Sequence, residues 1–262
     1  MQIDLSRYRI KLADTEEERA GAQRLRYRVF IEEMGAAASP EQQALRREWD
    51  AFDPYFDHLV LIDRDPAIAD PLDRVVGVYR LMRDSAAAEG IGFYGAGEYD
   101  LGPILAAGRA SVELGRSCVA AEHRGGPAVH LLWNGLAEYV LDRGIEILFG
   151  VASFHGTDPE PLAEPLAYLH HYHLAPADLR VRARPEQFLD MDRMRGDAIA
   201  PTRALQAIPA LIKAYLRLGG SVGEGAWIDH EFNTIDVCVV MDTTRMTARY
   251  RQFYARNKGR GG

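Results

Sequence analysis

The apolar residues of this chain stand at helical spacing in some stretches and in continuous runs in others. These two patterns predict its helices and strands. Helical spacing runs over residues 15–34, where Thr15 and Glu18 fit a capping box. A second helix is predicted to begin after Ser39 and to reach Trp49. We therefore expect the N-terminal part of the chain to be mainly helical.

Continuous apolar runs in the middle of the chain predict buried strands. The expected strands are residues 58–63, 75–82, 110–120 and 145–153. A glycine turn and a helix that ends at Gly144 separate the last two of these strands. A strand, a helix and a strand in this order form a βαβ unit, whose strands pair in parallel. We therefore expect a mixed α/β fold.

The C-terminal third predicts further helices beside this sheet. The expected elements are helices at residues 158–172, 204–218 (kinked at Pro209) and 247–257, and strands at residues 179–184 and 235–241. Residues 84–108 are rich in Gly and Ala and predict a long loop with a short helix. Because no linker divides the chain, we expect a single domain over residues 1–262, with 258–262 as a disordered tail.

Charge and cysteine content narrow the function classes. The 262 residues carry a net charge of -7 and two cysteines, Cys118 and Cys238. Nucleic-acid binders are usually basic, so we expect no nucleic-acid partner. Two cysteines cannot form a disulfide framework and suit a reducing compartment. With neither a signal sequence nor a spanning apolar run in view, we expect a cytoplasmic protein, with peripheral contact at the inner face of the membrane as an option.

A glycine turn, Arg124-Gly125-Gly126, stands between the strand and the helix of the predicted βαβ unit. Glycines let the backbone approach a ligand closely, and a helix N-terminus favours phosphate. A pantetheine phosphate or a pyrophosphate would suit this turn. An ordinary turn before a helix is the alternative interpretation.

Two charged residues, Glu113 and Arg116, interrupt the apolar strand that precedes this turn. Burying either of them unpaired would be costly. Regular alternation puts them on opposite faces of the sheet, whereas a bulge at Gly115 would bring both to one side. The alternative to a functional pair is a structural ion pair.

Further candidates lie in the helical N-terminal part. Arg26, Phe30 and Glu33 share one helix face, and Asp50 and Asp53 follow the second helix. Two acids in a loop can orient a cationic amine, but they also suit turns and caps. A solvated helix face with one core aromatic remains the alternative for the first group.

The order of these residues resembles that of acyl-homoserine-lactone synthases, a branch of the GCN5-related N-acyltransferase (GNAT) fold. A closer resemblance is to the L-ornithine Nα-acyltransferases of ornithine-lipid synthesis. The stretches that carry it are residues 25–34, 113–119, 153–159, 214–220 and 229–237. This resemblance implies a GNAT-like central mixed sheet, largely antiparallel, with helices on both faces and with additional helices in the C-terminal third.

The resemblance also implies the chemistry. The donor would be a 3-hydroxyacyl group on acyl carrier protein, the acceptor would be the α-amine of ornithine, and neither a bound cofactor nor a metal would be needed. Other acceptors remain open, namely glycine, another amino acid or adenosylmethionine. A non-enzymatic module that binds carrier protein or membrane is an alternative of another class.

Acyl transfer from a thioester needs a base for the amine, and Glu113 is the candidate. Arg116 would hold Glu113 or bind the substrate carboxylate in a forked pair. The expected substrate-binding residues are Arg26, Phe30, Asp50, Asp53, Arg80 and His155, and the expected phosphopantetheine-binding residues are Arg124, Gly125 and Gly126. His155 qualifies because sites in such sheets lie at strand ends.

Three other groups are weaker candidates. Cys118 follows an apolar strand and is expected to be a packing residue rather than a nucleophile. His170 and His173 share a helix face, but no acid or cysteine stands at a matching spacing for a metal. Tyr168 or Tyr172 as the acid for the leaving thiolate rests on analogy with the fold alone.

Overall fold

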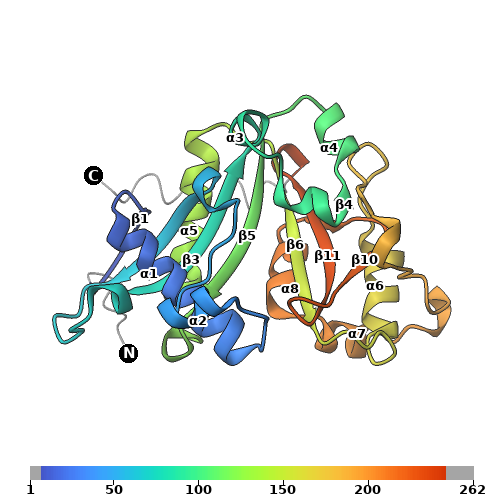
Figure 1. The fold of residues 1–262 in the computed structure, drawn as a ribbon. Coiled ribbons are helices and arrows are strands. Elements are labelled where there is room, and N and C mark those ends of the chain that lie inside the picture. Colours follow the sequence, from blue (N-terminus) through green and yellow to red (C-terminus); the bar gives the residue numbers. More distant parts are fainter. Residues whose placement is uncertain (1–6, 246–262) are drawn as a thin grey trace. The chain divides into compact units, whose positions relative to one another are not determined.

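The computed structural model describes residues 7–245, and its fold is drawn in Figure 1. The chain divides into two compact units. Among the described residues, unit 1 holds residues 7–91 and Leu114–Gly144, and unit 2 holds Gly92–Glu113 and residues 145–245. The single domain expected from the sequence stays a prediction, and the helix and tail expected after residue 245 lie outside the described residues.

Unit 1 contains strands in the order β1-β2-β3-β5. Their bounds are β1 Tyr8–Leu12, β2 Asp57–Asp63, β3 Val75–Arg83 and β5 Ser111–Val119, of which unit 1 holds the part from Leu114 on. The β1–β2 and β2–β3 pairs are antiparallel, with a shift of register between Leu61 and Ile62. The sequence analysis predicted β2, β3 and β5 but not β1, a five-residue strand in which charged and apolar side chains alternate.

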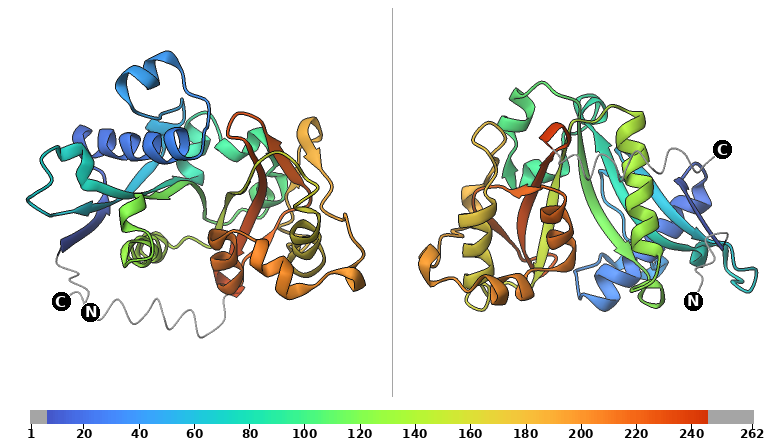
Figure 2. Two further views of the ribbon diagram at one scale, coloured as in Figure 1. Left: turned by 90° about the horizontal axis from the view of Figure 1, so that it is seen from below. Right: turned by 180° about the vertical axis from the view of Figure 1, so that it is seen from behind.

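Two helices, α1 (Glu16–Arg26) and α5 (Ala128–Asp142), cover opposite faces of these strands (Figure 2). The Thr15 hydroxyl accepts the N–H of Glu18 at 3.1 Å, which confirms Thr15 as the N-cap, whereas the Glu18 carboxylate accepts the N–H of Asp14 at 3.0 Å rather than closing the predicted capping box. After α1 the chain continues as a π-helix over Tyr27–Glu33. The predicted extent of this helical stretch is therefore confirmed, although its second half winds more loosely than an α-helix.

The second helix, α2 (Pro40–Leu45), begins with the predicted capping box at Ser39. Its predicted end at Trp49 is wrong. Arg46 adopts a left-handed backbone conformation with φ of 48°, which ends the helix after Leu45. The following residues are therefore not on a helix face but turn toward the interior of unit 1.

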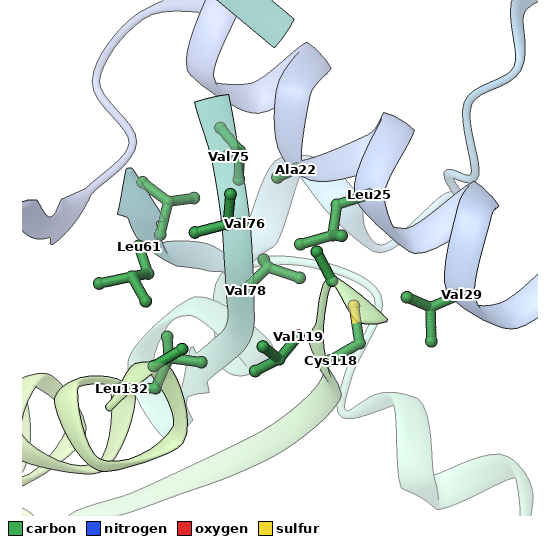
Figure 3. Close-up of a cluster of buried hydrophobic side chains, with 13 residues drawn as sticks. Ala22, Leu25, Val29, Leu61, Val75, Val76, Val78, Cys118, Val119 and Leu132 are labelled. Atoms are coloured by element: carbon green, nitrogen blue, oxygen red, sulfur yellow. The ribbon is translucent and has the colours of Figure 1, made fainter. Parts of the chain in front are cut away.

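The hydrophobic core of unit 1 joins both helices to the strands (Figure 3). Leu25 and Val29 come from the helical stretch, Val78 from β3 and Leu132 from α5. Cys118 is part of the same cluster and is 7% exposed. This cysteine is therefore a packing residue, as expected.

Unit 2 contains an antiparallel run of strands in the order β6-β11-β10-β8, with β9 also paired to β11. Their bounds are β6 Ile147–His155, β8 Phe188–Leu189, β9 Ser221–Val222, β10 Ala226–Asp229 and β11 Thr234–Asp242. The first three residues of β5 pair in parallel with β6. With α5 between these two strands, the predicted βαβ unit and the mixed α/β class are confirmed.

The helices of unit 2 are α6 (Ala163–His173), α7 (Pro201–Ala207) and α8 (Ala210–Arg217). One kinked helix over residues 204–218 was predicted, and this is wrong, since the chain breaks between α7 and α8. Ile208 has a ψ of 132°, because proline disfavours helical backbone at the residue before it. No helix among residues 7–245 combines the length and the apolar character that crossing a membrane requires.

The segment expected as a long loop holds short elements. They are α3 (Asp84–Glu89), β4 (Tyr99–Asp100) and α4 (Gly102–Ala106), and β4 pairs with β7 (Arg182–Ala183), the short remnant of the strand expected at residues 179–184. The fully buried Tyr99 hydroxyl lies 3.0 Å from the carbonyl oxygens of both Gly225 and Asp236. Tyr99 thereby anchors this segment to the strands of unit 2.

Short 3₁₀ helices complete the description. They cover Asp53–Tyr55, Pro71–Arg74, Tyr94–Gly97, Ala121–His123, Pro185–Gln187, Gly196–Ala198 and Thr243–Arg245.

The contact of α5 with β1 gives a test of the fold. A Cβ atom added at Gly135 would lie 2.5 Å from Cγ1 of Ile10, so α5 has to shift in a Gly135→Val variant. We expect a loss of about 1–3 kcal/mol in the free energy of unfolding, measured by urea denaturation. Glu138→Val, on the exposed side of the same helix, is the control. Equal stability of the two variants would contradict this packing.

Candidate functional site

A buried ionic network in unit 1 contains five of the eleven predicted site residues. Arg26, at the end of α1, is fully buried. Its Nε lies 2.5 Å from Oε2 of Glu48, and its Nη2 donates to the Glu48 carbonyl at 2.6 Å and to Oδ2 of Asp53 at 2.8 Å. The end of α1 is thus tied to the segment that follows α2.

Arg80, on β3, is also fully buried and completes the pairing of the two aspartates. Its Nη1 lies 2.6 Å from Oδ1 of Asp53 and 2.8 Å from each carboxylate oxygen of Asp50. Its guanidinium carbon stands 4.3 Å from the centre of the Phe56 ring, where a cation is attracted to the aromatic face. The structure therefore brings Arg26, Asp50, Asp53 and Arg80 together.

Arg116 joins the network from β5. Its Nε lies 3.3 Å from Oε1 of Glu48, and its Nη2 lies 3.5 Å from Oδ2 of Asp50. The irregularity expected at Gly115 lies at Arg116 itself, whose φ of 50° is left-handed. The arginine side chain is 11% exposed, against 0% and 1% for Arg26 and Arg80. Arg116 is therefore the arginine of the network with the most room to meet a ligand.

Glu48 is a member of the network that the sequence analysis missed. We had expected α2 to run through this residue, which would have left Glu48 on a solvated helix face. The left-handed Arg46 ends the helix early, and Glu48 becomes 4% exposed. The signal in the sequence that could have identified Glu48 is its position two residues before Asp50, which was a predicted site residue.

Electrostatics hold this network in its ionised form. Burial opposes ionisation of Asp53, but Arg26 and Arg80 outweigh burial and lower the pKa of Asp53 well below its usual value. Burial also opposes ionisation of Glu48, and Arg26 and Arg116 outweigh it, so the pKa of Glu48 is lowered too. Burial together with Arg26 lowers the pKa of His58, which is therefore neutral at neutral pH. Three arginines and three carboxylates then balance in charge.

Glu113 belongs to unit 2 and has a different environment. It is 2% exposed, and its carboxylate accepts the backbone N–H of Tyr94 at 2.8 Å and that of Gly95 at 2.5 Å. A Cβ atom at Gly95 would lie 2.8 Å from Oε1 of Glu113, so glycine at this position leaves room for the carboxylate, which a larger residue would displace.

The glycine turn is exposed, and it opens α5. Gly125 has a φ of 75°, which favours glycine. Arg124 donates from Nε to the Val119 carbonyl at 2.9 Å and pairs with Glu33, Nη2 to Oε2, at 2.6 Å. Because the first N–H groups of a helix have no partner within it, the turn suits an anion. Its phosphate-binding role remains a prediction.

The remaining candidates occupy separate places. Phe30 is half-buried against the core of unit 1, and His155 is exposed at the end of β6. Burial raises the pKa of the Cys118 thiol to about 12, so the thiolate needed for nucleophilic attack is scarce at neutral pH. His171 lies 2.9 Å from Oδ1 of Asp192. A group of three acids that the sequence analysis did not identify, Glu98, Asp229 and Asp236, lies in unit 2.

Comparison with known proteins identifies the family. Residues 25–134 match the acetyltransferase (GNAT) domain. The chain is 56% identical over 255 residues to L-ornithine N(alpha)-acyltransferase of Rhodobacter capsulatus, covering 97% of each chain. The chain belongs to the L-ornithine N(alpha)-acyltransferase family. It is also 42% identical to the family member of Rhizobium meliloti, over 95% of this chain and 85% of that one.

One of the similar solved structures is a CoA-dependent acyl-homoserine lactone synthase. It is 16% identical, covers 94% of this chain and 84% of its own, and has a TM-score of 0.47. The 56% and 42% identities confirm the resemblance to the L-ornithine N(alpha)-acyltransferase family that the sequence stretches indicated.

The buried network gives a test with a defined pH dependence. Asp53→Asn removes one of the three carboxylates that balance the three arginines and leaves the network with one excess buried positive charge, so we expect a loss of about 3–5 kcal/mol in the free energy of unfolding at neutral pH. The folded-state pKa of Asp53 lies well below the unfolded value of 3.8. The contribution of Asp53 to stability is therefore fully present above pH 3.8 and is lost progressively as the pH falls from there through the folded-state pKa.

The stability gap between wild type and Asp53→Asn should accordingly narrow below about pH 4 in urea titrations. Asp190→Asn is the control, because Asp190 is exposed and its Oδ1 serves a turn, accepting the N–H of Asp192 at 2.9 Å. A gap that stays constant across this pH range would contradict the ionised network.

Proposed function

We propose that this chain transfers a 3-hydroxy fatty acyl group from acyl carrier protein to the α-amine of L-ornithine. The observation that carries the proposal is the 56% identity to L-ornithine N(alpha)-acyltransferase of Rhodobacter capsulatus, over 97% of both chains. The product would be a lyso-ornithine lipid, so we assign the reaction to the cytoplasm, with delivery at the inner face of the cytoplasmic membrane.

The transfer forms a C–N bond and breaks a C–S bond. The α-amine must be unprotonated to attack the thioester carbonyl carbon, and it loses a further proton as the thiolate leaves. Glu113 is the proposed base, because its carboxylate is buried and held by two backbone N–H groups. A fixed base within reach of the amine accelerates such a step by about 10²–10⁴-fold. The proton then passes to the departing thiolate.

Arg116 is proposed to bind the carboxylate of the amino acid. Its contacts to Glu48 and Asp50, at 3.3 and 3.5 Å, are the longest of the network, and a forked pair with a carboxylate would be stronger than either. Arg26 and Arg80 are fully buried and engage Glu48, Asp50 and Asp53. This burial favours a role in positioning for these two arginines over direct contact with the substrate.

The donor side of the reaction is proposed to use the glycine turn and the neighbouring helical stretch. The exposed turn at Arg124, Gly125 and Gly126 opens the 15-residue helix α5 and suits the phosphate of phosphopantetheine. Phe30 is half-buried and suits the apolar acyl chain. No bound cofactor enters the proposed reaction, since the carrier protein brings the thioester.

The direct test incubates purified protein with 3-hydroxyacyl carrier protein and a mixture of amino acids, and identifies the product by mass spectrometry. An ornithine conjugate is expected. A glycine conjugate as the main product would overturn the acceptor assignment, and the lack of any conjugate would overturn the activity.

The base can be tested by Glu113→Gln, which keeps one oxygen for a backbone N–H and removes the proton acceptor. We expect kcat with ornithine to fall by about 10²–10⁴-fold at neutral pH. The exposed Glu138→Gln on α5 is the matched control and should retain wild-type turnover. Near-normal turnover of Glu113→Gln would remove Glu113 from the base role.

Glycine at position 95 gives a second test of the same carboxylate. In Gly95→Ala the new Cβ would stand 2.8 Å from Oε1 of Glu113 and displace it, so we expect kcat to fall by about 10-fold or more. Gly97→Ala in the same 3₁₀ turn is the control, since a Cβ there meets no atom within 4 Å. Equal rates of both variants would indicate that the placement of Glu113 is not needed for turnover.

A further inference from the structure

The glycine turn of unit 1 directly follows a histidine for which the proposed reaction has so far no role. His123 ends the 3₁₀ helix Ala121–His123, and its N–H donates to the Ala120 carbonyl at 2.9 Å. The chain then folds back, so that a Cβ atom added at Gly126 would lie 3.5 Å from the carbonyl oxygen of His123. The backbone of His123 therefore lies directly beside the turn, and contacts that fix His123 also fix the turn.

The His123 side chain is hydrogen-bonded to the first strand of the sheet. Its Nδ1 lies 3.0 Å from the hydroxyl oxygen of Tyr8 on β1. The two rings meet edge to face, with their centres 5.8 Å apart and their planes at 83°, an arrangement that aromatic rings favour. Only 10% of the His123 side chain is exposed, so water competes little for this hydrogen bond.

The other ring nitrogen of His123 faces a buried carboxylate at the end of β2. Its Nε2 lies 3.7 Å from Oδ2 of Asp63, whose side chain is fully buried. Arg7 balances the charge of this carboxylate, since its Nε and Nη2 donate to the two oxygens of Asp63 at 2.9 and 2.5 Å. Burial opposes ionisation of Asp63, but the hydrogen bonds from Arg7 outweigh burial and lower the pKa of Asp63.

These two neighbours favour one orientation of the imidazole ring. An ionised carboxylate only accepts hydrogen bonds, so a neutral His123 ring carries its hydrogen on Nε2, toward Asp63. Nδ1 is then the acceptor, and the Tyr8 hydroxyl donates to it. A ring turned over by 180° would place carbon atoms against both partners. His123 is therefore held between β1 and the end of β2 in a defined position.

The other residues of the turn leave this task to the histidine. The two glycines have no side chains to pack, and a Cβ atom at Gly125 would meet no atom within 4 Å. Arg124 is bound to the Val119 carbonyl and to Glu33, but its side chain is 45% exposed and has room to meet an anion. Both ring nitrogens of His123 are engaged by the protein, which suits the histidine to holding the turn rather than to binding a ligand.

We infer that His123, held by Tyr8 and Asp63, is the positioning residue of the donor subsite. This inference rests on the proposed function, which assigns the phosphate of phosphopantetheine to the glycine turn. Glycine-rich backbone loses much conformational entropy when it is ordered, so a turn that is already fixed binds a phosphate at a lower cost. His123 thereby lowers the KM for the carrier-bound donor, and kcat does not depend on it, because it does not touch the reacting atoms.

The first test is Tyr8→Phe, which removes the hydroxyl and keeps the ring against His123. We expect the KM for 3-hydroxyacyl carrier protein to rise by about 3–10-fold, the effect of one lost hydrogen bond, while kcat and the KM for ornithine keep their wild-type values. Tyr55→Phe, at an exposed tyrosine of unit 1, is the control and should leave all three constants unchanged. A lower stability of Tyr8→Phe with an unchanged KM for the donor would assign the contact to folding alone and overturn the inference.

Variants of the histidine test the same contact from its other side. His123→Ala removes both ring contacts, and we expect the KM for the donor to rise by about 10-fold or more. His123→Asn should recover part of this loss, because the amide oxygen stands near the position of Nδ1 and can accept the Tyr8 hydroxyl. In the His123→Ala background, Tyr8→Phe should have no further effect, since both residues act through one hydrogen bond. Additive effects, or an asparagine variant no better than the alanine variant, would overturn the inference.

Calorimetric titration with holo and apo acyl carrier protein separates this inference from the proposed function. The apo form lacks phosphopantetheine, so Tyr8→Phe should weaken binding of the holo form by about 3–10-fold and leave binding of the apo form unchanged. This result would support the inference even where ornithine is not acylated, and the proposed function alone would then fail. Equal affinity of wild type and Tyr8→Phe for the holo form, or equal affinity of wild type for the holo and apo forms, would overturn the inference and leave the acylation of ornithine standing.

Discussion

The burial of Arg26 is the constraint on which much of unit 1 depends. A fully buried guanidinium must be paired, and its partners Glu48 and Asp53 come from a segment with little regular structure. Arg80 then shares Asp53, and Arg116 shares Glu48. Four stretches far apart in sequence are thus joined by charge as well as by apolar packing. Arg46 and Arg116 both have left-handed backbone. Arg46 ends α2 and lets the chain turn toward the interior, and Arg116 is itself the residue of β5 that joins the network.

The buried acids of unit 2 have an environment that differs from the arginine network of unit 1. Glu113 is held by backbone N–H groups, and one carboxylate oxygen from each of Glu98, Asp229 and Asp236 lies within 4.8 Å of the others. In unit 1 buried arginines fix the positions of the carboxylates, and Arg116 is the member of this network that is proposed to meet the substrate. In unit 2 two backbone N–H groups fix the carboxylate of Glu113. Both units therefore hold acids in fixed positions, one through arginines and the other through the backbone.

Local signals in the sequence predicted those features that depend on neighbouring residues. The caps at Thr15 and Ser39, the parallel unit around α5 and the apolar strands need only local periodicity. The gathering of Glu98 with Asp229 and Asp236 depends instead on strand pairing between distant segments, and composition gives no hint of it. Glu48 was missed because the sequence pattern predicted that α2 continues to Trp49, whereas the left-handed Arg46 ends the helix at Leu45. The family resemblance supplied five residues of the network, and the residue that it did not supply is Glu48.

The Gly- and Ala-rich stretch at residues 84–108 gains a physical explanation from these contacts. Its composition suggested a loop, yet its backbone supplies the two N–H donors that hold Glu113. In this geometry a Cβ atom at residue 95 would stand 2.8 Å from Oε1 of Glu113, so the glycine leaves room for the carboxylate. Tyr99 then anchors the same stretch through its buried hydroxyl and leaves Glu98 beside the strands that carry the other acids. Gly95 therefore helps to position the proposed base, and the buried Tyr99 fixes the stretch that carries Gly95 to the strands of unit 2.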